Sequence, residues 1–160
     1  MKYPPIHYHD YLKLDQLLTA NHPKSTEHGS PAHDEKLFIT IHQIYELWFQ
    51  QSLFELEKVQ TLFQQIPMSE NSPSVIQHHL ERVLMIFQHS LGIIDILETM
   101  TPMDFLDFRD FLFPASGFQS FQFRKIETIL GLRLENRHPY QNDLFYKTLK
   151  PEQQQAIEKL

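Results

Sequence analysis

His42 is the first residue whose type and spacing could support chemistry. It lies four residues after Phe38 and four before Glu46, so the three side chains share one side of a helix. A core histidine hydrogen-bonded to a neighbour is the commonest use of such a position, and a histidine and a glutamate at this spacing could also bind a metal. The sequence contains no second pair of this kind and no Glu-x-x-His motif of the di-iron bundles, which argues against a metal site.

Arg109 is the second candidate because it lies in an unusually apolar segment. A buried guanidinium without an anion is too costly, so Arg109 needs a carboxylate or an exit to solvent. An aspartate such as Asp107 or Asp110 could supply the anion internally. Alternatively, a ligand carboxylate could accept two parallel hydrogen bonds from the guanidinium, with Phe105 covering the apolar part of the ligand. The residues alone leave both alternatives open. The apolar neighbours are Phe105, Phe108, Phe111, Leu112 and Phe113.

The other candidates carry weaker signals. Tyr8, Tyr11 and Leu12 form an aromatic cluster of the kind that usually attaches a first helix to a core. Of the ten histidines, His42 and His89 lie in segments with apolar periodicity. Most of the remaining histidines have polar neighbours, and we expect them at the surface: His9, His22, His28, His33, His78, His79 and His138.

Two long helices must position these residues. Apolar side chains recur at intervals of three and four from about residue 34 to 65 and from about residue 74 to 100, which predicts two amphipathic helices. The first would be roughly 45 Å long, a length typical of a bundle. Its predicted buried stripe is Phe38, Ile41, Tyr45, Trp48, Leu56, Val59 and Phe63.

The second long helix has a predicted stripe of its own, and a loop joins it to the first at residues 66–73. The residues of that stripe are Ile76, Leu80, Val83, Phe87, Leu91 and Ile94.

Shorter helices flank this pair. We expect one helix over residues 11–18, followed by a polar loop over residues 21–31. Thr101 and Pro102 mark the start of a helix to about residue 112. A further helix over 118–130 should end at Gly131 as its C′ residue.

Residues 151–160 could form a marginal final helix, which either docks on the domain or awaits more protein. Sustained strand alternation is missing, so the sequence predicts an all-α fold, a helical bundle in one domain over residues 1–160.

Composition excludes several classes of protein. The formal net charge of −6 at pH 7 argues against a nucleic-acid binder. The sequence has no cysteine, which excludes disulfides, Cys-zinc sites and Cys nucleophiles. The first residues lack the apolar core of a signal peptide, and no run of eighteen apolar residues could span a membrane. We therefore expect a cytoplasmic protein without membrane partners.

Five segments together resemble a known family. The stretch 33–48 (HDEKLFITIHQIYELW) is similar to the signature helix of the haem-dependent tryptophan 2,3-dioxygenases. The segments 8–12, 97–101, 108–110 and 114–120 resemble further motifs of that family, in the family's order and spacing. The resemblance runs from about Tyr8 to the last residue.

The resemblance implies a role for each candidate residue. His42 would be the catalytic-site histidine on the distal side of the haem, hydrogen-bonded to the indole N–H of the substrate. Phe38 and Phe105 would pack on the substrate, and Arg109 would bind its carboxylate. Ser116 and Gly117 would lie close to the haem. The full set of implied substrate-binding residues is Tyr8, Tyr11, Leu12, Phe38, Ile39, Thr40, Ile41, His42, Phe105 and Arg109.

The implied reaction inserts both atoms of dioxygen across the indole C2=C3 bond of L-tryptophan and gives N-formylkynurenine. Haem b would be the cofactor, and a homotetramer the implied assembly, in which Tyr8, Tyr11 and Leu12 reach into the site of a neighbouring subunit. Whether His42 would accept a proton or only orient the ring stays open.

The sequence departs from the family in one respect. The proximal haem histidine and a threonine that contacts the substrate ammonium group have no counterpart, so no residue here is expected to bind the metal. His138 does not match the proximal position. We therefore expect the substrate-recognition half of the enzyme. The alternatives are a non-enzymatic relative that binds an indole amino acid and a helical module that acts only through oligomerisation.

Overall fold

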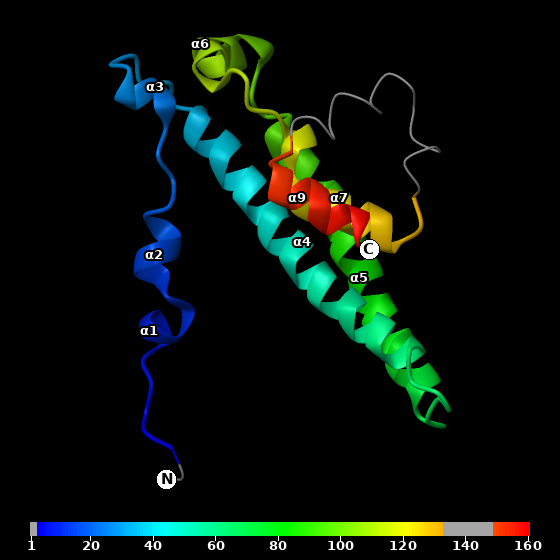
Figure 1. Cartoon of the computed structure of the whole chain (residues 1–160). Coiled ribbons are helices and arrows are strands. Elements are labelled where there is room, and N and C mark those ends of the chain that lie inside the picture. The colour runs from blue at the N-terminus through cyan, green and yellow to red at the C-terminus, as the bar shows by residue number, and fades with distance from the viewer. Residues whose placement is uncertain (1–2, 133–148) are drawn as a thin grey trace.

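A computed structural model describes residues 3–132 and 149–160 of the chain. The described residues form helices and no strand, so the predicted all-α class is confirmed. The two long helices, α4 (Glu35–Phe63) and α5 (Ser72–Leu97), run antiparallel as one extended hairpin (Figure 1). No single described helix is long and apolar enough to cross a membrane, although α5 and the following helix meet that criterion as a pair bent by 104°.

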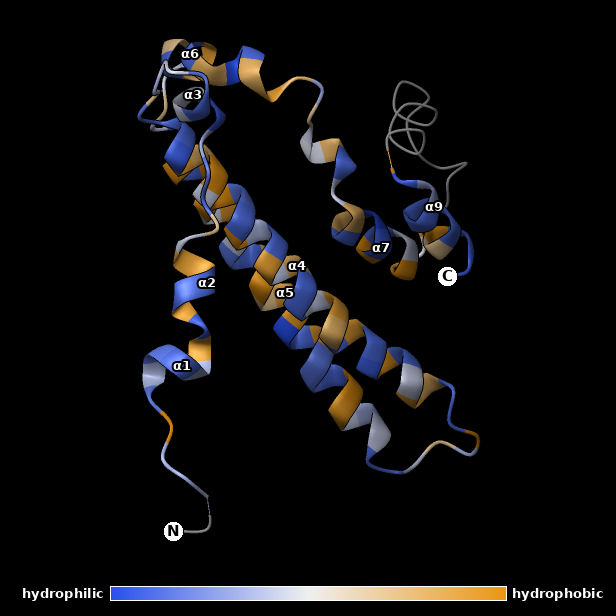
Figure 2. Ribbon diagram, turned by 60° about the vertical axis from the view of Figure 1, so that its left-hand side comes forward, coloured by the Kyte–Doolittle hydropathy of each residue, from blue (hydrophilic) through white to orange (hydrophobic). Residues whose placement is uncertain are grey.

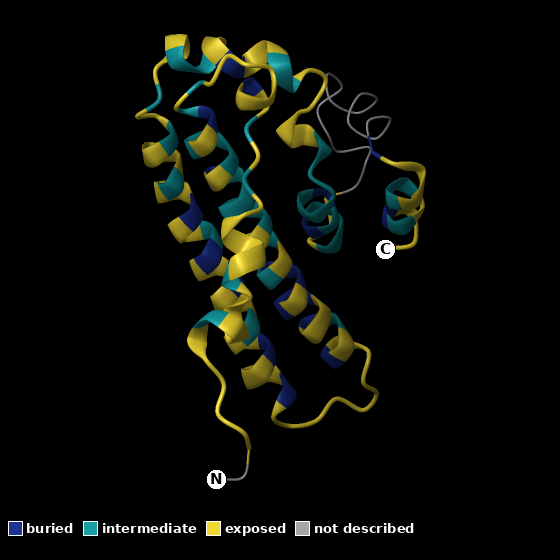
Figure 3. Cartoon of the chain, turned by 90° about the vertical axis from the view of Figure 1, so that its left-hand side faces the viewer, coloured by how far each residue is buried: buried dark blue, intermediate teal, exposed yellow. Residues whose placement is uncertain are grey.

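The core of the molecule lies between α4, α5 and α7 (Phe121–Ile129). Buried residues follow the facing sides of the long helices, whereas their outer faces are exposed (Figure 3). The predicted stripes are therefore partly wrong: Trp48, Phe63 and Leu91 are 42%, 59% and 68% exposed. Periodicity marks every apolar face of a helix, but here only part of each face meets another helix. The buried apolar residues of the two clusters in the hairpin are Leu53, Leu56, Val59, Leu62, Ile76, Val83 and Ile126.

The N-terminal segment differs from its prediction in two places. The expected single helix is two short ones, α1 (Tyr8–Leu12) and α2 (Leu14–Leu18), because Lys13 between them adopts a left-handed conformation with φ of 53°. The expected loop contains a short helix, α3 (Lys24–Glu27). Helices α1 and α2 stand apart from the hairpin in Figure 1, and Figure 2 shows that both carry apolar residues there.

Helix α6 (Pro102–Leu112) begins where the sequence predicts. Thr101 accepts a hydrogen bond from the backbone N–H of Asp104, and the Asp104 carboxylate accepts one from the N–H of Thr101 at 2.9 Å. Hydrogen bonds from the side chain and backbone of Thr101 hold the pKa of Asp104 below its usual range. This reciprocal cap fixes the start of the helix that carries Arg109.

The rest of the chain returns to the hairpin. A short 3₁₀ turn, η1 (Gly117–Gln119), precedes α7, so the helix expected over 118–130 is interrupted at Ser120. Gly131 has φ of 88° just after α7, as its predicted C′ position requires. Helix α9 (Pro151–Glu158) docks on α7, where Ile157 is 5% exposed.

Candidate functional site

His42 presents a hydrogen-bond acceptor to the site. Its Nδ1 lies 2.7 Å from the backbone oxygen of Phe38. Because a carbonyl oxygen only accepts, Nδ1 carries the proton of that bond, and in the neutral ring Nε2 is left with a free lone pair. The His42 ring also lies against the Phe38 ring, with 4.2 Å between the centroids. The backbone of α4 therefore sets both the tautomer and the tilt of this imidazole.

Three phenylalanine rings join α4 to α6 beside His42. The Phe38 ring lies 5.7 Å from Phe105 and 5.5 Å from Phe108, and Phe105 meets Phe108 edge to face at 5.3 Å. Phe108 is fully buried and anchors α6, whereas Phe38 and Phe105 remain half-buried. Half-buried aromatic faces at contact distance offer a flat apolar ligand a stacking surface.

Arg109 lies at the rim of an open cavity of about 580 Å³. Its side chain is exposed, and none of the hydrogen bonds or ion pairs among the described residues involves it. The internal pair with Asp107 or Asp110 is therefore not formed. The guanidinium is free to bind an anion in a space that Phe38 and Phe105 share. The other lining residues are Leu106, Asp110, Leu112, Phe113, Pro114, Ala115, Ser116 and Gly117.

A second open cavity, of about 630 Å³, lies on the His42 side of Phe38, between α2, α4 and the segment after α6. Its walls are mainly apolar, with His42, Glu46 and Gln122 among the polar residues. Gln122 donates from Nε2 to the backbone oxygen and to Oε2 of Glu46, both at 2.8 Å, and so ties α7 to α4. Phe38, Leu112, Ala115, Ser116 and Gly117 line both cavities, which makes them one continuous site.

Comparisons with known proteins identify the family. The sequence matches the profile of tryptophan 2,3-dioxygenase over residues 3–160. The chain belongs to the tryptophan 2,3-dioxygenase family. It is 58% identical over 154 residues to the tryptophan 2,3-dioxygenase of Bdellovibrio bacteriovorus, 50% over 133 residues to that of Aedes aegypti, and 42% over 153 residues to that of Dictyostelium discoideum.

The match covers only part of these dioxygenases. The match to the Bdellovibrio protein covers 96% of this chain and 43% of that protein. The match to the Aedes protein covers 83% of this chain and 34% of that protein, and the match to the Dictyostelium protein covers 96% of this chain and 38% of that protein. The chain thus spans less than half the length of the relatives that it matches.

The structure brings together some of the residues that the dioxygenase resemblance implies and separates others. Ile39 lines the cavity beside His42, and Ser116 and Gly117 line both cavities. Ile41, in contrast, is 2% exposed and belongs to the core. The hydroxyl of Thr40 donates to the backbone oxygen of Lys36 and accepts from Asn21. The side chains of Thr40 and Ile41 are therefore not at the site, because they lie on other faces of α4.

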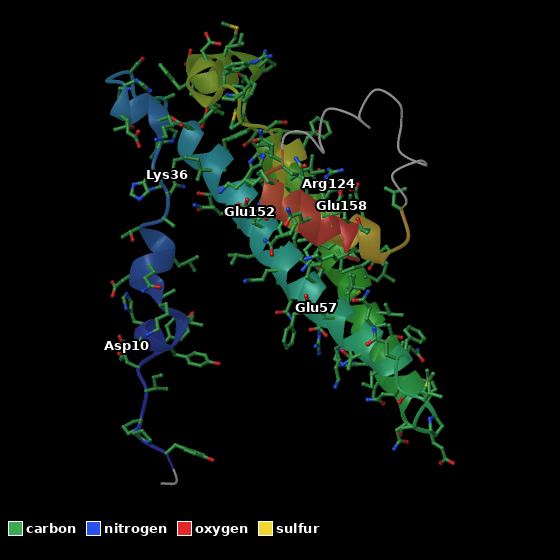
Figure 4. The ribbon with its side chains drawn as sticks, in the orientation of Figure 1. Asp10, Lys36, Glu57, Arg124, Glu152 and Glu158 are labelled. Atoms are coloured by element: carbon green, nitrogen blue, oxygen red, sulfur yellow. The ribbon has the colours of Figure 1, made fainter. Side chains whose placement is uncertain are left out.

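Tyr8, Tyr11 and Leu12 do not reach the cavities of their own chain. They are 70%, 69% and 40% exposed on α1, whose most extensive contacts among the described helices are with α2. The side chain of Asp10, on the same helix, projects far from Lys36 at the start of α4 (Figure 4). His138 lies outside the described residues.

Three residues near the site carried no signal in the sequence. Gln43 and Gln122 each hold another segment onto α4, since Gln43 donates to the backbone oxygen of Ala20 at 3.0 Å. Glu35 is fully buried at the first residue of α4. Their partners lie 10 or more residues away along the chain, so helical spacing could not reveal these contacts.

Proposed function

We propose that this chain is the substrate-recognition part of a haem-dependent dioxygenase that converts L-tryptophan to N-formylkynurenine. One observation carries the proposal. The His42 imidazole, whose Nδ1 bonds the Phe38 carbonyl, and the Arg109 guanidinium, which has no ion pair among the described residues, line two cavities that share Phe38. An indole amino acid has the matching groups: an N–H donor, a flat aromatic system and a carboxylate.

Each residue then has a defined task. Arg109 binds the substrate carboxylate through paired hydrogen bonds, which its planar fork allows. Phe38 and Phe105 pack against the indole. Nε2 of His42 accepts the indole N–H, because Nδ1 is already committed to the Phe38 carbonyl. Together these contacts orient the C2=C3 bond for insertion of both oxygen atoms.

The segment of Ser116 and Gly117 offers a wall against which one face of a haem would lie. The walls there are apolar, and a Cβ placed on Gly117 would meet nothing within 4 Å. His42 is the only histidine that lines these cavities among residues 3–132 and 149–160. Ser116 and Gly117 would hold the edge of the haem, which supplies dioxygen binding and activation when bound.

Oligomerisation completes the proposed site. Tyr8, Tyr11 and Leu12 are exposed on a helix that stands apart from the hairpin. A second copy of the chain, in a homotetramer, would receive these side chains over its own cavities. Apolar side chains on such an exposed segment gain burial when a second copy covers them.

A chimera tests the function. Residues 1–160 replace the matching segment of the Bdellovibrio relative, and the product of L-tryptophan with dioxygen is identified by mass spectrometry. We expect N-formylkynurenine, and its loss in the Arg109→Ala version of the same chimera. A folded, haem-loaded chimera without product contradicts the dioxygenase assignment. If the chain alone still binds L-tryptophan, the non-enzymatic binding module is then the correct alternative.

A further inference from the structure

We propose that Glu35 is a positioning residue: its buried carboxylate holds α3 against the start of α4, and α3 in turn sets where α6 presents Arg109. The inference rests on the proposed function, because it assigns Arg109 to the carboxylate of the ligand. It adds to that function a contact network that determines whether Arg109 and His42 can engage one ligand together.

Glu35 is a carboxylate with no exposed surface and only backbone partners. Its Oε1 accepts the N–H of Lys24 at 2.7 Å, and its Oε2 accepts the N–H of Ser25 at 2.9 Å. None of the ion pairs in the described part of the chain includes it. Burial of a carboxylate is costly, and these two charge-assisted bonds offset that cost only while α3 stays in place.

Two further bonds close this corner of the molecule. Ser25 is fully buried, and its Oγ accepts the N–H of Ala32, which folds the segment after α3 back toward α4. On the other side of α3, Asn21 donates to the backbone oxygen of Lys36, close to the start of α4 (Figure 4). Helix α3 is too short to be stable alone, so its position depends on these contacts.

Helix α3 is the main packing partner of α6. Among the described helices, α6 makes its most extensive backbone contacts with α3. The ring of His28, directly after α3, stacks on Phe111 with 5.1 Å between centroids and 12° between planes. Phe111 lies two residues beyond Arg109 on α6. A shift of α3 therefore moves the helix that carries the guanidinium.

A second attachment of α6 leads back to the same helix, α4. Phe38, one turn after Glu35, contacts Phe105 and Phe108 of α6. The contact with Phe38 fixes how close α6 lies to His42. The contact with α3 restrains the rotation of α6 about its contact with Phe38. Without the Glu35 bonds, α6 keeps its anchor but Arg109 loses its fixed direction. Binding of the ligand carboxylate should suffer, while stacking of the ring should not.

The first test compares Glu35→Gln with Glu27→Gln. The glutamine side chain keeps the shape but turns one acceptor into a donor that faces a backbone N–H. Glu27 lies on α3, is exposed and pairs with the Lys24 ammonium group. Its replacement by glutamine is therefore the matched control. We expect amide hydrogen exchange in α3 and α6 to accelerate about tenfold in Glu35→Gln only, with α5 unchanged.

The ligand measurement uses L-tryptophan and tryptamine, which lacks the carboxylate, with the 160-residue chain in a calorimeter. In Glu35→Gln the affinity for L-tryptophan should fall about tenfold, and that for tryptamine less than about twofold. Equal losses for both ligands overturn the positioning role and leave Glu35 a purely structural residue.

A second pair of variants breaks the contact from the α3 side, in case Glu35→Gln does not fold. Lys24→Pro removes the N–H bonded to Oε1. Proline suits this first position of α3, because Pro23 before it is extended with ψ of 127°. Lys24→Ala loses the same ammonium group but keeps the N–H. Faster exchange in α6 for Lys24→Pro and not for Lys24→Ala supports the inference.

The two proposals fail in different ways. If α6 exchanges at the wild-type rate in both Glu35→Gln and Lys24→Pro, the coupling from α3 to α6 is wrong, whatever the ligands do. If the wild-type chain binds no L-tryptophan while α6 still responds to both substitutions, the proposed function is wrong and the mechanical coupling stands.

Discussion

His42 and Arg109 are held in their working states by different means. The Phe38 carbonyl accepts a hydrogen bond from Nδ1 of His42, so Nε2 is the nitrogen that faces a ligand. Arg109 is available because no carboxylate within the described chain pairs with it, although Asp110 lines the same cavity. A ligand with one donor and one carboxylate therefore satisfies two groups that the chain alone leaves unsatisfied.

Arg109→Lys in the chimera should reduce kcat/KM for L-tryptophan by about ten- to a hundredfold, the effect of losing one charge-assisted hydrogen bond. Lysine keeps the charge but not the paired donors. The melting temperature should stay unchanged, because Arg109 forms no ion pair within residues 3–132 and 149–160. Steady-state kinetics with L-tryptophan and tryptamine are the measurement. Equal losses on both substrates with a large drop in melting temperature would rule out the carboxylate contact.

His42→Ala should abolish discrimination between L-tryptophan and its benzothiophene analogue, which has sulfur in place of the N–H. The wild-type chain should prefer L-tryptophan by about three- to tenfold, as expected for one neutral hydrogen bond to Nε2. Calorimetric titration of both ligands into both proteins measures how far the preference for L-tryptophan depends on His42. A preference that survives in His42→Ala would assign the N–H contact to another group.

Some candidate residues can be recognised from the sequence because their signal is local. An arginine among phenylalanines and a histidine flanked at helical spacing are visible without coordinates. His79 was wrongly expected at the surface, since its partner Glu55 is 24 residues away on the other long helix. Thr40 and Ile41 were misplaced because adjacent helical positions lie about 100° apart, so a continuous segment cannot face one cavity.

At the scale of elements, Glu55 connects α4 to α5 in the middle of the hairpin. Its carboxylate is 1% exposed and accepts hydrogen bonds from Gln51 at 2.6 Å and from Arg82 at 2.9 Å, while His79 bonds its other oxygen. Burial raises the pKa of Glu55, but the hydrogen bonds from His79, Arg82 and Gln51 outweigh burial and hold that pKa below its usual range.

Glu55→Gln should lower the free energy of unfolding by about 1–3 kcal/mol at neutral pH. The Glu55 pKa is lowered in the folded state, so its stabilisation is complete above the unfolded value, about 4.3, and is lost as pH falls below it. Urea unfolding at pH 7 and near pH 3 should therefore show that the difference in free energy of unfolding between wild type and Glu55→Gln becomes smaller in acid. A gap that is constant with pH would contradict a charged Glu55.

Glu57→Gln on the same helix is the matched control for that experiment. Glu57 is 58% exposed and lies 3.6 Å from Lys125, so its removal should cost less than about 1 kcal/mol.

The long helices themselves were predictable from periodicity and the start of α6 from its cap. The break at Lys13 was not, because lysine gives no warning of a left-handed backbone.

At the scale of the whole molecule, the described residues leave much apolar surface exposed. Among the described helices, α7 packs most extensively on the hairpin of α4 and α5, and large side chains such as Phe54 and Leu91 are each 68% exposed. Apolar patches of this extent usually mark interfaces. Apolar periodicity predicts burial at such positions, but no described residue covers them.

Self-association should follow from this surface, and one open cavity on the hairpin locates it. Leu47, Trp48 and Met85 are each about half exposed and line a space of about 940 Å³ between α4 and α5. The wild-type chain should sediment as a dimer or larger species at micromolar concentration. Met85→Lys places a charge in the cavity and should shift the chain toward monomer, because an unpaired ammonium group cannot be buried cheaply.

Met103→Lys, at a residue 68% exposed on α6, adds the same charge elsewhere and should leave the assembly unchanged. A wild-type chain that is monomeric and binds no dye for apolar surface would refute the prediction, and equal effects of the two lysines would place the interface outside this cavity.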